Sequence, residues 1–157
     1  MMHPVVKVDD YVFRGGRPET DGDWRILCGL GITTVLNVEG GIIESLSADP
    51  NRQQIKALAC GMEQVRIGMS ALFAPHRIEV DAALAVLARP NAHPDKYGRV
   101  YVHCHMGVDR TGFVIAAYRM RYYDWKYDRA VNEMVRMGFH RWYRYWLPAL
   151  RHWENVR

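Results

Sequence analysis

A cysteine, an arginine and a threonine stand close together in the C-terminal half of the chain. The sequence there reads His103-Cys104-His105-Met106-Gly107-Val108-Asp109-Arg110-Thr111-Gly112. The five residues between Cys104 and Arg110 are enough for the main chain to curl round one phosphate group and offer it N–H groups. Gly107 permits so tight a turn because it has no side chain. The spacing predicts a phosphate-binding loop made of His105, Met106, Gly107, Val108, Asp109 and Arg110.

The residue types in this loop suit phosphoryl transfer. Main-chain N–H groups and the start of a helix favour an ionised thiolate at Cys104, which is the form that acts as a nucleophile. Arg110 offers a planar fork of donors that matches two phosphate oxygens. The Thr111 hydroxyl is placed to bond the sulfur when it leaves a phosphocysteine intermediate. Because the thiolate is already ionised, we expect His103 to organise the loop rather than to act as a base.

A strand and a helix must position this loop. Residues 99–103 alternate apolar and polar side chains and run directly into Cys104, whereas residues 111–120 are apolar enough for a buried helix. Open α/β sheets bind ligands at the carboxyl ends of their strands. A phosphate-binding loop directly after the strand at 99–103 is therefore in the expected place. The alternative, a core cysteine beside an unrelated surface arginine, requires the glycine, the strand end and the helix start to coincide by chance.

The rest of the chain alternates strands and helices in the same way. Apolar runs predict strands over residues 5–13, 32–38 and 62–67. Helices are predicted from a capping box at Thr20 and Asp23, from Asp49-Pro50, over 78–87 and 127–135, and from about Trp142 to the end. We therefore expect an α/β fold with a central, mostly parallel sheet of four to five strands, helices on both faces, and one domain over residues 1–157.

Composition excludes several other classes of protein. Of 157 residues 49% are hydrophobic, and 21 Lys and Arg against 17 Asp and Glu leave a net charge of only +4. That bias is too mild to indicate nucleic-acid binding, but it can steer a small anionic phosphate ester or a phosphorylated protein. Three cysteines and no signal-peptide pattern favour the cytoplasm, and no apolar run predicts membrane insertion. We expect no metal, because His103 and His105 lack ligand spacing, and no cofactor.

The order His-Cys, five residues, Arg-Thr-Gly resembles the signature loop of the protein-tyrosine phosphatase superfamily, and is most similar to its dual-specificity branch. The resemblance extends more weakly to residues 14–18, 36–38 and 69–75. It implies a phosphomonoester hydrolase that forms a phosphocysteine at Cys104. Phosphotyrosine or dual-specificity protein substrates are the first expectation, and inositol phosphates or phosphoinositides are the alternative.

The sequence departs from the family at the general acid. Most members carry an aspartate on a mobile loop before the nucleophile, but here Ala71 stands at that place and no carboxylate lies between Glu63 and Glu79. Asp109 is the substitute that the resemblance suggests, since myotubularin and Sac-type lipid phosphatases carry an aspartate at this position of the loop. A structural carboxylate that accepts hydrogen bonds from the loop is the competing interpretation of Asp109.

Further hypotheses concern residues outside the loop. His76 and Asp81 are alternative acids, and without any acid the chain would be a low-turnover module that binds phosphorylated residues. Cys28 and Cys60 either form a protective disulfide with Cys104 on oxidation or fill the core. The basic and aromatic residues 136–157 predict a packed terminal helix rather than a surface for nucleic acid, and three of them could line the mouth of the site: His140, Arg141 and Tyr143.

Overall fold

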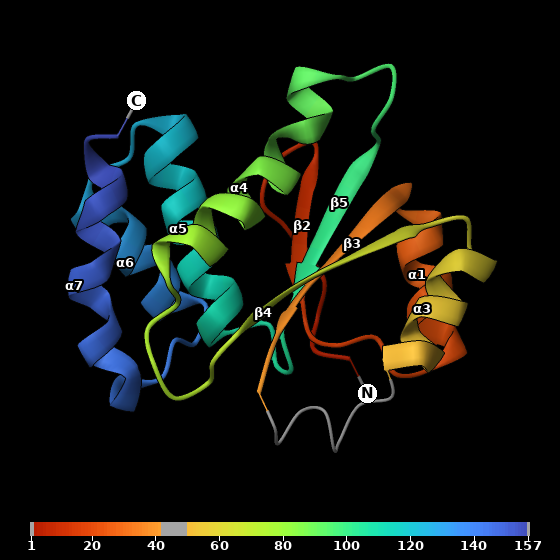
Figure 1. The fold of residues 1–157 in the computed structure, drawn as a ribbon, viewed down its shortest axis with the longest axis horizontal. Helices are drawn as coiled ribbons and strands as arrows, with labels where there is room; N and C mark the ends of the chain where they lie inside the picture. Colours follow the sequence, from red (N-terminus) through yellow and green to blue (C-terminus); the bar gives the residue numbers. More distant parts are fainter. Residues whose placement is uncertain (1, 42–49, 157) are drawn as a thin grey trace.

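The computed structural model describes residues 2–41 and 50–156, so the expected helix cap at Asp49 lies outside the described residues. Five strands form one sheet in the order β1-β2-β5-β3-β4, and Figure 1 labels β2, β5, β3 and β4. Strands β2, β5, β3 and β4 pair in parallel, whereas β1 pairs antiparallel with β2. The expectation of a mostly parallel sheet is confirmed, with these strand bounds: β1 Val6–Lys7, β2 Val12–Gly15, β3 Ile32–Glu39, β4 Glu63–Met69 and β5 Arg99–His103.

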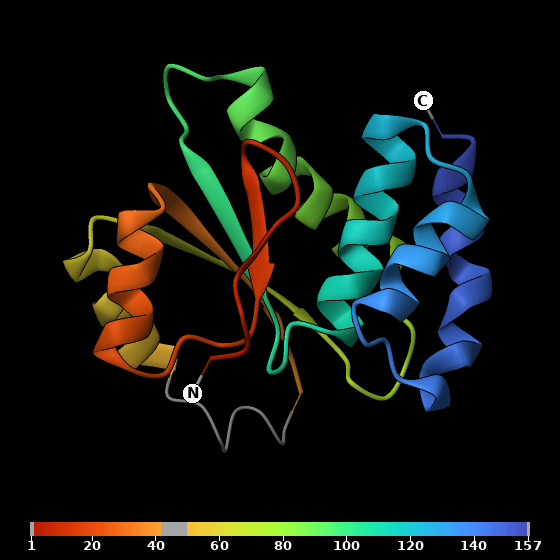
Figure 2. The same ribbon diagram turned by 180° about the vertical axis from the view of Figure 1, so that it is seen from behind.

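Helices cover both faces of the sheet, as the α/β fold class predicts. Helices α1 (Asp21–Gly29) and α3 (Pro50–Ala59) lie on one face. Helices α4 (Arg77–Ala92) and α5 (Asp109–Tyr123) lie on the other, with α6 (Tyr127–Arg136) packed outside α5 (Figures 1 and 2). Within the described residues, no helix combines the length and the apolar character that crossing a bilayer requires.

Each face of the sheet has its own hydrophobic core. Successive side chains of a strand point to opposite faces, and in β5 Val100 and Val102 join the core beneath α4 and α5. Tyr101, which lies between them, joins the core that contains Trp24 of α1. Both faces of β5 are therefore buried, as is usual for a central strand of a parallel sheet.

The start of α1 agrees with the sequence-based expectation, since the capping box at Thr20 is present and α1 begins directly after it. The end of β4 and the start of α5 differ from the expectation. Strand β4 continues to Met69 because it pairs with β3 up to Glu39, so the following loop begins later than its sequence indicates. Helix α5 begins at Asp109 rather than at Thr111, which places Asp109 and Arg110 in its first turn.

The C-terminal segment is the main correction. The single helix expected from about Trp142 is instead a 3-10 helix at Arg141–Trp146, a short α7 at Leu147–Leu150 and a second 3-10 turn at Arg151–Glu154. Pro148 lies inside this segment, and proline removes a main-chain donor and crowds the preceding turn, so one continuous α-helix does not form. The segment nevertheless packs on α5, because Trp146 and Trp153 are buried and contact Phe113 edge to face.

Candidate active site

Cys104 lies directly after β5, and the loop that follows it turns sharply into α5. Gly107 has a φ of +74°, a left-handed conformation that favours glycine. A Cβ at this position would lie 2.1 Å from the carbonyl oxygen of Gly15, so the neighbouring β2 leaves no room for a side chain. The glycine that the sequence singled out is therefore required both by its conformation and by its surroundings.

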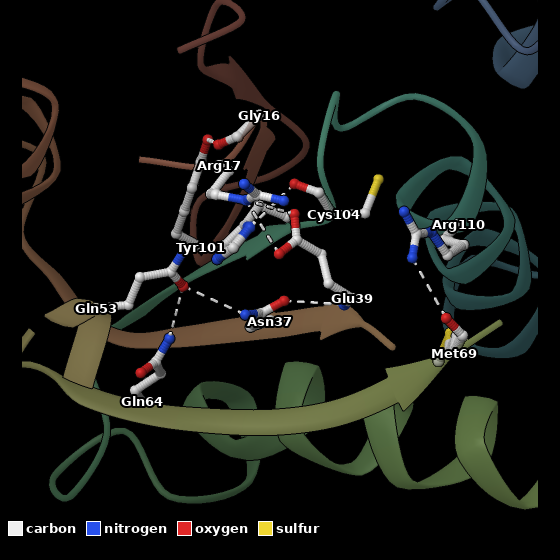
Figure 3. A network of polar contacts seen from close by, with 11 residues as sticks. Gly16, Arg17, Asn37, Glu39, Gln53, Gln64, Met69, Tyr101, Cys104 and Arg110 are labelled. Carbon is white, nitrogen blue, oxygen red and sulfur yellow. Dashed lines mark hydrogen bonds and ion pairs between the residues drawn. The ribbon is translucent and has the colours of Figure 1, made fainter. Parts of the chain in front are cut away.

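Cys104 and Arg110 lie close together at this turn, and Thr111 follows Arg110 in the first turn of α5. Cys104 and Arg110 are 3% and 6% exposed, and Figure 3 shows the sulfur of Cys104 on the side of Arg110, turned away from Glu39. The Arg110 guanidinium donates from Nη1 to the carbonyl oxygen of Met69 at 3.3 Å, which ties it to the end of β4. The Thr111 hydroxyl is fully buried and has no hydrogen-bond partner among the described residues. It is therefore available to a thiolate or a phosphate oxygen.

His103 supports the loop from beneath as an uncharged residue. It is completely buried, and this burial lowers the pKa of its imidazole to about 4, with the positive charges of Arg17 and Arg110 acting in the same direction. Its Nδ1 lies 3.1 Å from the carbonyl oxygen of Cys104. A neutral ring with its proton on Nδ1 donates to that oxygen, which fits the expected organising role.

Two arginines of the N-terminal segment hold the loop from outside. Arg14 donates from Nη2 to the carbonyl oxygens of Gly107 at 2.8 Å and Val108 at 3.4 Å. The main-chain N–H of Arg17 donates to the carbonyl oxygen of His105 at 3.0 Å. In a planar trans peptide the N–H points opposite to the carbonyl. The N–H groups that follow these three carbonyls therefore point away from Arg14 and Arg17.

The sequence offered no direct signal that Arg14 and Arg17 contact the loop. Residues 14–18 were considered only because they weakly resemble the family. Burial lowers the pKa of the Arg14 guanidinium, while the charges of Cys104 and Glu133 raise it and partly offset that effect. Arg17 forms an ion pair with Glu39 in which Nε lies 2.8 and 3.1 Å from the two carboxylate oxygens. Both side chains of this pair are at most 7% exposed (Figure 3).

Asp109 is held by a residue far away in sequence. Its Oδ1 accepts a hydrogen bond from the main-chain N–H of His140 at 2.9 Å, and its Oδ2 lies 2.7 Å from Nδ1 of the same histidine. The expectation that His140 lies near the site agrees with this contact. The geometry is compatible with both interpretations of Asp109, as a general acid and as a structural carboxylate.

The loop in which the family resemblance predicts an acid follows Met69, whose carbonyl oxygen Arg110 contacts. Residues 70–76 are fully described and contain no carboxylate, and Ala71 is partly buried. The Ser70 hydroxyl accepts hydrogen bonds from the N–H groups of Leu72 and Phe73. The Tyr145 hydroxyl donates to the carbonyl oxygen of Leu72, which joins this loop to the C-terminal segment.

The remaining candidates are spread over the fold. Asp81 accepts a hydrogen bond from Nε1 of Trp153 at 2.9 Å, so it anchors the C-terminal segment. His76 is exposed at the start of α4. The cysteines Cys28, Cys60 and Cys104 are all free, and the disulfide with Cys104 stays a prediction. Among the described residues, no group of three or more His, Cys, Asp or Glu side chains could hold a metal ion.

Solved structures with the same fold include several phosphatases. The core catalytic domain of the PP-IP phosphatase SIW14 from S. cerevisiae is 18% identical, with a TM-score of 0.75 over 93% of this chain and 82% of that one. PTPMT1 is 17% identical, with a TM-score of 0.75 over 96% and 93%. P. aeruginosa TpbA is 20% identical, with a TM-score of 0.64 over 97% and 91%. No curated protein sequence matches the chain.

A family match agrees with this fold and with the loop after β5. Residues 25–146 match the family described as "Dual specificity phosphatase, catalytic domain", and the matched region includes the whole segment from His103 to Thr111. The match covers well over half of the chain, so it does not depend on the short loop alone. This protein therefore belongs to the dual specificity phosphatases, a branch of the protein-tyrosine phosphatase superfamily.

Proposed function

We propose that the chain, as one domain over residues 1–157, hydrolyses phosphomonoesters through a phosphocysteine at Cys104. The observation that carries the proposal is the Cys104 sulfur lying on the side of Arg110, together with the buried hydroxyl of the next residue, Thr111, which has no hydrogen-bond partner among the described residues. A buried hydroxyl without a partner costs free energy, and a thiolate or a bound phosphate would satisfy it.

Each step of the reaction has a residue in the loop. The Cys104 thiolate attacks phosphorus while Arg110 and the main-chain N–H groups of the loop hold the equatorial oxygens. Asp109 protonates the departing oxygen in place of the absent loop acid. Water then attacks the phosphocysteine, inorganic phosphate leaves, and Thr111 stabilises the released thiolate. No step uses a metal or a cofactor.

A phosphorylated protein, with phosphotyrosine or mixed specificity, is the first proposed substrate, in the cytoplasm, where free cysteines persist. An inositol phosphate or phosphoinositide is the second. Two similar structures favour the second candidate, since SIW14 is named as a PP-IP phosphatase and PTPMT1 was solved in complex with PI(5)P. Asp109, at a position that lipid phosphatases share, points in the same direction.

Turnover of p-nitrophenyl phosphate tests the reaction. We expect the wild-type protein to release phosphate, orthovanadate to inhibit it, and a chelator to have no effect. Cys104→Ser should abolish turnover, whereas Cys28→Ser, at an exposed free cysteine on α1, should not. Hydrolysis that persists in Cys104→Ser, or that a chelator removes, would contradict the mechanism.

A substrate panel separates the proposed classes. Phosphotyrosine, phosphoserine and phosphothreonine peptides, soluble inositol phosphates and phosphoinositides would be compared by kcat/KM with the same protein. Preference for peptides would support the first proposal, and preference for the inositol compounds would support the second. Tight binding of phosphopeptides without turnover of any compound would instead indicate a binding module.

A further inference from the structure

His140 binds both carboxylate oxygens of Asp109. The main-chain N–H donates to Oδ1 at 2.9 Å and the ring nitrogen Nδ1 lies 2.7 Å from Oδ2. The two side chains are largely buried, with 26% of His140 and 16% of Asp109 exposed. The imidazole also stacks on Trp142, with ring centroids 4.3 Å apart and planes at 19°. The carboxyl group is thus oriented by one residue at two points, and that residue is itself held in place.

Such an arrangement is what a general acid needs. A side chain that transfers a proton must lie within hydrogen-bond reach and in a fixed orientation before the reaction begins. Asp109 directly precedes the phosphate-clamping Arg110 in the first turn of α5, and residues 70–76 carry no other acid. The contact with His140 therefore fixes the carboxyl group of the residue next to the arginine that we expect to hold phosphate.

We propose that His140 is the positioning residue for Asp109, and this rests on the proposed function. Nδ1–H of His140 donates to Oδ2 whether Asp109 is protonated or not. The transferable proton is then on Oδ1, which still accepts the hydrogen bond from the main-chain N–H of His140. His140 itself does not touch the substrate; it orients the acid and stabilises the carboxylate that the acid becomes.

The proton balance closes over the two steps. In the first step the sulfur–phosphorus bond forms, the phosphorus–oxygen bond of the ester breaks, and the departing oxygen takes the proton from Oδ1. In the second step water attacks phosphorus and returns a proton to Oδ1, while the sulfur–phosphorus bond breaks and the Cys104 thiolate is restored. Nδ1–H of His140 donates to the Asp109 carboxylate between the two steps.

Two substitutions at one position test the proposal. His140→Phe keeps a ring that can stack on Trp142 and keeps the main-chain N–H, but it has no ring nitrogen. His140→Asn restores a side-chain N–H donor close to the place of Nδ1. His93→Ala is the control, because this histidine is exposed at the end of α4. For each variant, kcat and KM are measured with an activated aryl phosphate and with an alkyl phosphate.

An acid assists by about 10² to 10⁴ fold, mainly when the leaving group is poor. We expect His140→Phe to lower kcat for the alkyl phosphate about 10- to 100-fold, to change the aryl ester less than about threefold, and to leave KM unchanged. His140→Asn should recover most of the loss. In an Asp109→Asn background His140→Phe should have no further effect on kcat.

Other outcomes overturn the proposal in distinguishable ways. Equal slowing with both leaving groups, or failure of asparagine to restore the rate, would mean that His140 only stabilises the fold. Thermal unfolding of each variant identifies a loss of fold. If His140→Phe does not fold, the leaving-group dependence of kcat in His140→Asn is compared with that in Asp109→Asn. This comparison decides whether His140 positions the acid or only stabilises the fold. If the wild-type protein hydrolyses neither compound, the proposed function fails and the role of His140 fails with it.

Discussion

The guanidinium of Arg14 bonds the carbonyl oxygen of Gly107 at 2.8 Å, across 93 positions of sequence. Arg14 belongs to β2 and is 3% exposed, while Gly107 lies at the tip of the loop after β5. The same Nη2 reaches Val108 at 3.4 Å. A strand end on the neighbouring β2 thus sets the direction of the peptide groups that we expect to bind phosphate.

Removing this bond should weaken anion binding. Hydrogen bonds from a charged donor contribute about 1.5–3 kcal/mol. We expect Arg14→Met to raise the vanadate Ki at least about tenfold, because about 1.4 kcal/mol corresponds to a factor of ten. Arg14→Lys, with a single donor group, should have an intermediate effect. Arg25→Met is the control, since Arg25 is exposed on α1; equal inhibition constants for Arg14→Met and Arg25→Met would contradict the prediction.

A methyl group at Gly107 should damage the site more than the fold alone can explain. Gly107 and Gly61 both have positive φ, +74° and +71°, but only at Gly107 does a Cβ meet another atom, the Gly15 oxygen at 2.1 Å. Left-handed strain costs about 1–3 kcal/mol at either position. We expect Gly61→Ala to lower the melting temperature but keep kcat, and Gly107→Ala to lower kcat/KM at least about tenfold. Similar kinetics in the two variants would be the contrary result.

The buried ion pair between Arg17 and Glu39 should matter most when only one partner is removed. An unpaired buried charge destabilises a fold by about 3–5 kcal/mol. We therefore expect Arg17→Met to lower the free energy of unfolding by about that amount, and the double variant Arg17→Met with Glu39→Gln to be more stable than Arg17→Met alone. Urea titration measures both. Additive losses would show that the two side chains do not stabilise each other.

His103 predicts a specific dependence of stability on pH. Burial lowers its pKa to about 4 from an ordinary value of 6.5. Between these values the unfolded chain takes up a proton that the folded chain does not, so this contribution to stability is present above pH 6.5 and is lost as pH falls toward 4. The loss amounts to roughly 3 kcal/mol. His103→Asn should show a shallower decline in urea titrations from pH 7 to 4, and parallel curves for the two proteins would exclude the effect.

The sequence predicted the strand, loop and helix around Cys104 because all their determinants are local. These determinants are the alternating side chains before Cys104, the glycine in the loop and the apolar run after Thr111, and they follow one another directly along the chain. The predicted start of the helix, Thr111, was less accurate. Helix α5 begins at Asp109, because Asp109 and Arg110 belong both to the loop and to the first turn of the helix. The prediction of a single C-terminal helix was wrong, because Pro148 interrupts the helix that the apolar spacing predicts.

The sequence by itself determined which groups could do the chemistry and on which elements they lie. Only the tertiary structure decided how those groups are held. Arg14 reaches the loop because β2 and β5 are parallel neighbours, and His140 reaches Asp109 because the chain returns to the site after α6. The partners of the first contact are separated by 93 positions in the sequence, and those of the second by 31. Nothing in the local pattern of either partner specifies the other. Local propensity selects the elements, whereas packing of distant surfaces orients the peptide groups and the carboxyl group that we expect to act on phosphate.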